Sequence, residues 1–155
     1  MRRNDRELTD RRAIDTILAK GEVCHIAFVD KTEPYLVTLN YGFKRDSQLR
    51  LYFHCATEGR KIDIIKTNPK VCFSVDTDHE LVTASDACGW GMKFKSVVGT
   101  GVIEILTDTE EKQIGLDTLV SHYGSIGRHE YRKEIFNRTI VLRLTVTNIT
   151  GKQRI

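Results

Sequence analysis

Hydrophobic and polar residues alternate along much of this chain, and a period of two is typical of β-strands with one buried face. The alternation is clearest near the end, where Ile140, Leu142, Leu144 and Val146 occupy every second position. The sequence predicts strands over residues 23–30, 35–43, 49–55, 71–75, 97–106 and 139–147. The first three are joined by short connections, which favours an antiparallel meander.

Helical segments are fewer, and the sequence predicts them over residues 9–20, 58–66 and 107–123. Thr9 or Asp10 can cap the first helix, and Thr107 or Asp108 the third, because each offers a side-chain oxygen to free backbone N–H groups. Six strands with few helices indicate a mainly β fold, a small antiparallel barrel with attached helices.

Residues 76–95 have the least regular pattern. This segment holds Trp90 between Gly89 and Gly91. A loop that exposes an aromatic side chain is a candidate functional element, although a packed loop is the more common outcome. The sequence leaves both interpretations open.

The composition of the chain excludes several classes of protein. The 155 residues include 40% apolar and 29% charged residues, which fits one globular domain over residues 1–155. A net charge of +3 is too small to indicate nucleic-acid binding. No apolar stretch is long enough to span a membrane, and none follows the charged N-terminus, so we expect a cytoplasmic protein.

The four cysteines form no CxxC pair and no zinc-binding spacing, so no metal site is expected. Cys24, Cys55 and Cys72 lie within strand-like apolar runs, whereas Cys88 does not. Buried, reduced thiols are therefore predicted for the first three.

The densest polar cluster is His54-Cys55-Ala56-Thr57-Glu58-Gly59-Arg60-Lys61, where a strand leads into a helix. A helix N-terminus exposes unpaired N–H groups and a partial positive charge. Arg60 and Lys61 add two cations there, which favours a bound anion such as phosphate. Two solvated surface cations are the alternative. His54 should point away from the Leu49, Leu51 and Phe53 face, toward a ligand or a neighbouring strand.

The run from Tyr52 to Asp63 strongly resembles the FHCAxxGxKxD signature of nitroimidazole-resistance-type proteins. These belong to the broader pyridoxamine 5′-phosphate oxidase-like flavoproteins. Three weaker motifs agree in order and spacing: residues 34–41 resemble the family's P-x-x-V-P-L-S-Y strand, residues 95–101 its R-S-V-x-x-x-G strand, and residues 149–152 its ITGK terminus.

The resemblance implies an FMN-binding split β-barrel that forms a homodimer with the cofactor between its subunits. Arg60 and Lys61 would bind the FMN phosphate, and Lys95 and Ser96 would make further contacts. Backbone groups of Val37, Thr38, Leu39 and Asn40 would edge the isoalloxazine ring, with His54 near its reactive side and Cys55 among the cofactor contacts. FAD is possible in place of FMN.

The implied activity is reduction of a small-molecule electron acceptor, nitroaromatic (5-nitroimidazole-like) or quinone-like, by a flavin-dependent oxidoreductase. Asn40 replaces the family's usual serine, and Lys95 replaces an arginine, which removes the bidentate fork. The chain lacks the basic C-terminal motif of true pyridoxamine 5′-phosphate oxidases, so vitamin B6 oxidation is disfavoured. The alternative is a non-catalytic flavin- or haem-binding protein in which His54 is an axial ligand.

Overall fold

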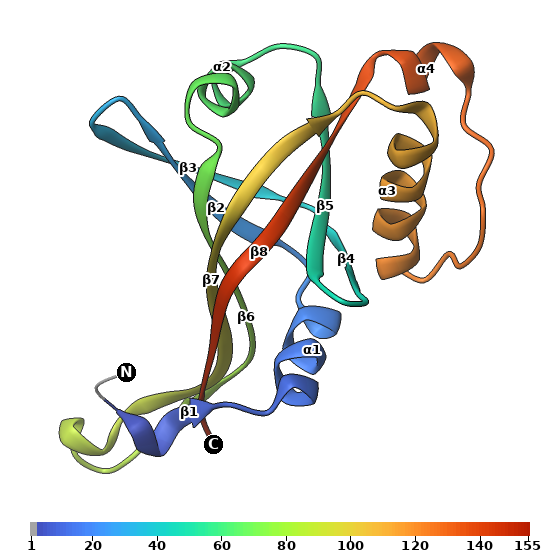
Figure 1. Cartoon of the computed structure of the whole chain (residues 1–155). Coiled ribbons are helices and arrows are strands. Elements are labelled where there is room, and N and C mark those ends of the chain that lie inside the picture. Colours follow the sequence, from blue (N-terminus) through green and yellow to red (C-terminus); the bar gives the residue numbers. More distant parts are fainter. Residues whose placement is uncertain (1–2) are drawn as a thin grey trace.

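The computed structural model describes residues 3–155 (Figure 1). Its centre is one eight-stranded antiparallel sheet in the order β3-β2-β6-β7-β8-β5-β4, with β1 paired to β8. The strands are β1 Glu7–Leu8, β2 Cys24–Asp30, β3 Glu33–Leu39, β4 Gly42–Arg45, β5 Leu49–Ala56, β6 Lys70–Val82, β7 Gly91–Leu106 and β8 Thr139–Arg154.

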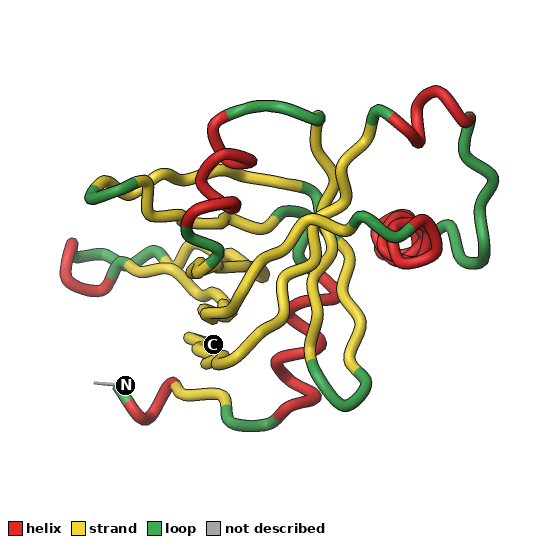
Figure 2. The backbone as a smooth tube through the Cα atoms, turned by 45° about the horizontal axis from the view of Figure 1, so that its top comes forward, coloured by secondary structure: helices red, strands yellow, loops and turns green. Residues whose placement is uncertain are grey.

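The sheet curls into a barrel because its two outermost strands are neighbours in the chain. β3 and β4 stand at opposite ends of the strand order, yet only Asn40 and Tyr41 separate them. Figure 2 shows the strands wrapping around a common interior. This arrangement confirms the predicted mainly β, antiparallel barrel with attached helices.

Four α-helices flank the barrel: α1 Arg11–Lys20, α2 Arg60–Thr67, α3 Thr109–His122 and α4 Lys133–Asn137. Short 3₁₀ turns occur at Asn4–Arg6 and Ala87–Gly89. Asp10 and Asp108, rather than their threonine neighbours, cap α1 and α3 by accepting backbone N–H bonds. The sequence missed α4, which has no buried residue to mark it. Within residues 3–155 no helix is both long and apolar enough to cross a membrane.

The core lies inside the barrel and is built from alternate strand residues, including Phe28, Phe53 and Phe73. A second, smaller cluster lies outside the barrel under α3 and consists of Tyr52, Leu106, Leu116 and Val141. The alternation read from the sequence therefore marks the inner face of the barrel correctly, while Tyr52 shows that part of the outer face is also covered.

Strand boundaries were predicted wrongly in three parts of the chain. The strand expected over 35–43 breaks at Asn40, because Tyr41 turns into the core, where its hydroxyl donates to the Leu18 carbonyl at 2.5 Å. The segment 76–95 is mostly a continuation of β6 and β7 as a two-stranded hairpin. β8 runs on to Arg154. These extensions pair by backbone bonds and by exposed contacts such as Lys93–Glu80, so they need no apolar alternation.

The prediction of buried thiols holds for Cys24 only. Cys55 is half-buried, and Cys72 is exposed because its neighbours Val71 and Phe73 face the core and alternation turns Cys72 outward. Cys88 is exposed in the hairpin end.

Candidate functional site

The N-terminus of α2 is open to a ligand. Gly59 occupies the N-cap position with φ +131°, and apart from its two chain neighbours no described residue lies within 4 Å of where its Cβ would be. No side chain of residues 3–155 caps this helix, in contrast to the aspartates at α1 and α3. The first-turn N–H groups and the positive end of the helix dipole are therefore available to an anion, as predicted.

Arg60 begins this helix and is held in place from two sides. Its Nε donates to Asp30 Oδ2 at 2.8 Å, and its Cζ lies 4.6 Å from the centroid of the Tyr35 ring. Both partners belong to the β2–β3 hairpin. Within residues 3–155 the two Nη groups have no hydrogen-bond acceptor, so a fixed guanidinium presents free donors.

Lys61 follows as a half-buried cation with no carboxylate partner within the described chain. It lies close to Cys55 at the end of β5: burial raises the pKa of the Cys55 thiol, and the Lys61 ammonium acts in the opposite sense. An unpaired ammonium beside an uncapped helix end suits an anionic ligand better than a neutral one.

His54 is exposed and lies on the face of β5 opposite Leu49, Leu51 and Phe53, as predicted. The same face carries Tyr52, which α3 covers at Gly115. Across residues 3–155 the His54 ring has no hydrogen-bond partner. Alternation places His54 and Cys55 on opposite sides of β5. That His54 faces a cofactor stays a prediction.

The residues predicted to edge a flavin ring lie at the end of β3, an edge strand whose outer backbone groups face away from the sheet. Val37 and Leu39 pack against the core, whereas Thr38 points outward. The Thr38 hydroxyl lies 2.9 Å from Nδ1 of His25, a residue that the sequence analysis missed. Asn40 donates to the Tyr123 hydroxyl at 3.3 Å.

Lys95 and Ser96 lie on β7, opposite Thr77 and Asp76 of β6. Lys95 Nζ is 3.1 Å from Asp78 Oδ2, and hydrogen bonds from Lys95 and Lys20 lower the pKa of that carboxyl. Asp78 sits in a β-bulge with φ +57°, which turns its carboxylate between the two lysines. Lys95 is therefore already ion-paired.

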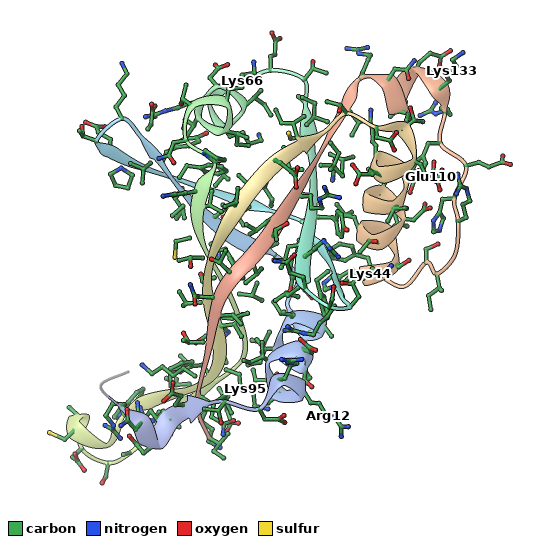
Figure 3. The ribbon with its side chains drawn as sticks, viewed as in Figure 1. Arg12, Lys44, Lys66, Lys95, Glu110 and Lys133 are labelled. Atoms are coloured by element: carbon green, nitrogen blue, oxygen red, sulfur yellow. The ribbon has the colours of Figure 1, made fainter. Side chains whose placement is uncertain are left out.

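The chain does not bring its two groups of predicted phosphate ligands together. Lys70, just after α2, pairs with Val102, and Lys95 lies seven positions farther along β7. At about 3.3 Å per residue, the distance along β7 between Lys95 and the position next to α2 is about 23 Å. Figure 3 labels Lys66 of α2 and Lys95 at opposite ends of the molecule. The site around Arg60 and Lys61 thus lacks Lys95 and Ser96 of its own chain.

Comparison with known families gives the context for this geometry. The family model described as pyridoxamine 5′-phosphate oxidase matches residues 10–153. This chain belongs to the pyridoxamine 5′-phosphate oxidase family. Family membership supports the split-barrel fold, while activity depends on the site of each member. A search of curated proteins finds no match.

Solved structures of similar shape agree with the split-barrel fold. A protein of Bacteroides thetaiotaomicron, assigned provisionally to 5-nitroimidazole antibiotic resistance, has 29% identity and a TM-score of 0.82 over 95% of this chain and 86% of its own. Flavocytochrome Anf3 of Azotobacter vinelandii has 22% identity and a TM-score of 0.81 over 100% and 72%. An FAD- and haem-binding protein of Mycobacterium smegmatis has 21% identity and a TM-score of 0.81 over 96% and 73%. The last two support the fold alone, which is the predicted split barrel.

Proposed function

We propose that this protein is a flavin-dependent reductase that binds the phosphate of FMN at the N-terminus of α2. The observation that carries the proposal is the combination, within the described residues, of an uncapped helix end, an unpaired Lys61 and a fixed Arg60 with free Nη groups. The residues fit the group: a phosphate supplies the oxygen acceptors that these donors lack.

Each predicted residue then has a separate task. Lys61 and the α2 N–H groups bind the phosphate, and Arg60 adds its Nη donors. Backbone groups of Val37, Thr38, Leu39 and Asn40 orient the ring at the edge of β3, and His54 holds a proton for the acceptor. When bound, the flavin supplies the electron transfer, which side chains alone do not perform.

A second copy of the chain would complete the site. The outer face of the sheet exposes Leu36, Val98, Val29 and Val102 by 62, 47, 45 and 43%. Exposed apolar faces of this kind are usually buried by association. In a two-fold symmetric contact the same face of both subunits meets in opposite directions. A two-fold axis through this face would therefore place Lys95 and Ser96 at one end of the sheet of one subunit near α2 at the other end of the sheet of its partner. We therefore propose a homodimer with FMN between its subunits.

The proposed acceptor is a small nitroaromatic or quinone-like molecule. Support comes from the 29% identity to the Bacteroides protein, which is assigned provisionally to 5-nitroimidazole resistance. The chain's part in such a reaction is to bind the acceptor against the ring and to supply protons.

The absorption spectrum of the purified protein tests the proposal. We expect flavin bands, and bleaching of those bands by a reduced nicotinamide or dithionite, followed by recovery when an anaerobic nitroimidazole or quinone is added. A Soret band would instead support the haem-binding alternative. A flavin that is reduced but never reoxidised by these acceptors would contradict the reductase role.

His54→Ala separates a catalytic histidine from a structural one. We expect the variant to keep its flavin and its melting temperature and to lose about 10²-fold or more of its acceptor turnover, since proton donation by a positioned side chain contributes on that order. Turnover per bound flavin and thermal unfolding are the two measurements. A lower melting temperature with normal turnover per flavin would remove His54 from the site.

A further inference from the structure

A serine, a histidine and an aspartate form a hydrogen-bonded row beside α3. The Ser125 hydroxyl lies 2.9 Å from Nε2 of His129, and Nδ1 of the same ring lies 3.2 Å from Oδ1 of Asp117. Asp117 belongs to α3, whereas the other two residues belong to the segment over 123–132, which runs back along this helix toward α4 (Figure 1). No residue proposed to bind the flavin takes part in this row.

The order of the three groups is that of a serine-hydrolase triad, in which a carboxylate orients a histidine and the histidine activates a hydroxyl. An ionised carboxylate only accepts hydrogen bonds, so Nδ1 of His129 carries the ring proton and donates it to Asp117. Nε2 is then unprotonated and accepts the hydrogen bond from the Ser125 hydroxyl. The ring therefore has the tautomer that a general base requires.

Asp117 is held firmly in its orienting position. The Tyr131 hydroxyl donates to Oδ1 at 3.0 Å, Gln113 Nε2 donates to Oδ2 at 3.0 Å, and the backbone N–H of His129 donates to Oδ1 at 3.2 Å. Burial raises the pKa of Asp117, but these hydrogen bonds outweigh burial and hold the pKa below its ordinary value. The Asp117 and His129 side chains are 16 and 23% exposed, whereas Ser125 is open to solvent. A sheltered base thus adjoins an accessible nucleophile.

The two backbone N–H groups that follow Ser125 are available to a ligand. Those of Ile126 and Gly127 have no acceptor within residues 3–155. Backbone donors next to a nucleophile stabilise the negative charge that develops on an ester carbonyl oxygen during attack. The Ile126 side chain is 90% exposed and offers an apolar contact to an acyl group.

A cleft of about 630 Å³ begins next to the triad, between α3 and β4. Small-molecule sites have volumes of roughly 300–1,000 Å³, so the cleft has room for a small ligand. Asp117 and Gly127 form part of its wall, and Phe43 and Ile114 give it an apolar side. Lys44, labelled in Figure 3, also lines it and has no ion-pair partner within residues 3–155. An ester with an apolar part and a negative charge matches these walls.

We propose that this protein also hydrolyses small carboxylic esters, with Ser125 as the nucleophile. The Ser125 oxygen bonds to the ester carbonyl carbon while Nε2 of His129 takes the hydroxyl proton. The bond from that carbon to the alkoxy oxygen then breaks, and the alcohol leaves with the proton from His129. Water hydrolyses the acyl-serine by the same route, which yields the carboxylic acid and restores the hydroxyl. This activity goes beyond the proposed flavin function and does not depend on it.

A fluorophosphonate and p-nitrophenyl acetate test the proposal on the flavin-loaded protein. We expect the fluorophosphonate to modify Ser125, located by mass spectrometry of peptides, and to stop ester hydrolysis. Ser125→Ala and His129→Gln should each lower hydrolysis by about 10²-fold or more, because each removes the nucleophile or its base. Ser47→Ala is the matched control, since Ser47 is an exposed serine whose hydroxyl contacts only Asp46 among the described residues.

Thermal unfolding and flavin content of each variant are measured alongside. A network that only fixes the segment over 123–132 predicts a lower melting temperature in His129→Gln and no reaction of Ser125 in the unaltered protein. Failure of the fluorophosphonate to modify Ser125, or hydrolysis that persists in Ser125→Ala, would overturn the proposal. Either result leaves the flavin site at α2 untouched, because no flavin contact is altered.

Discussion

Two variants that fail to bind FMN separately are expected to recover binding when they are produced together. One carries Arg60→Ala and Lys61→Ala, and the other carries Lys95→Ala and Ser96→Ala. If each site combines α2 of one subunit with β7 of the other, a mixed dimer has one intact site and one doubly altered site. Random pairing would then restore about a quarter of the normal flavin content.

The physical reason for this prediction is the separation within one chain. Lys95 pairs opposite Thr77, whereas α2 adjoins the Lys70 end of the same strand. A rigid two-stranded ladder does not fold back to close that gap. Coexpression with two different affinity tags isolates the mixed dimer, and its flavin absorbance per protein is the measurement.

A matched control uses Lys66→Ala with Lys93→Ala, an exposed lysine on α2 and a half-buried lysine on β7 that belong to neither proposed group. These variants should bind normally alone and together. An isolated mixed dimer with no flavin, although each variant is folded by circular dichroism, would show that the site does not span the two subunits in this way.

The second large effect is expected on discrimination between FMN and riboflavin. Replacing both Arg60 and Lys61 with alanine removes hydrogen bonds to a charged group, worth about 1.5–3 kcal/mol each. FMN binding should weaken by about two orders of magnitude or more, because 1.4 kcal/mol is a factor of ten. Riboflavin has no phosphate, so its affinity should change little.

Fluorescence titration of the apoprotein with each flavin measures both affinities. The single variants show how much each cation contributes to FMN binding. We expect Lys61→Ala to weaken FMN binding more than Arg60→Ala does, because Lys61 has no partner in the described chain, whereas Arg60 is already paired with Asp30. Equal weakening of FMN and riboflavin would place the phosphate elsewhere.

The strand pattern and the site motif could be read from the sequence because both are local. Alternation at Ile140, Leu142, Leu144 and Val146 reflects one buried face, and the strand-to-helix step at Gly59 is visible in neighbouring residues. For the same reason, the N-cap of the first helix and that of the third could each be narrowed to two neighbouring residues. The hairpin extension of β6 and β7 escaped prediction because exposed two-stranded ribbons pair through backbone bonds and leave no apolar signature.

By itself, the sequence determined the antiparallel barrel, the position of α2 and the cations at its start. Only the tertiary structure decided which of the predicted phosphate-binding cations are free. Arg60 meets Asp30 and Tyr35 through the β2–β3 hairpin, about 30 residues earlier, and Lys95 on β7 meets Asp78 through a bulge. It also decided that the two groups of predicted phosphate ligands lie at opposite ends of the sheet. Such facts depend on register and on contacts between distant segments, which no local pattern of residues encodes.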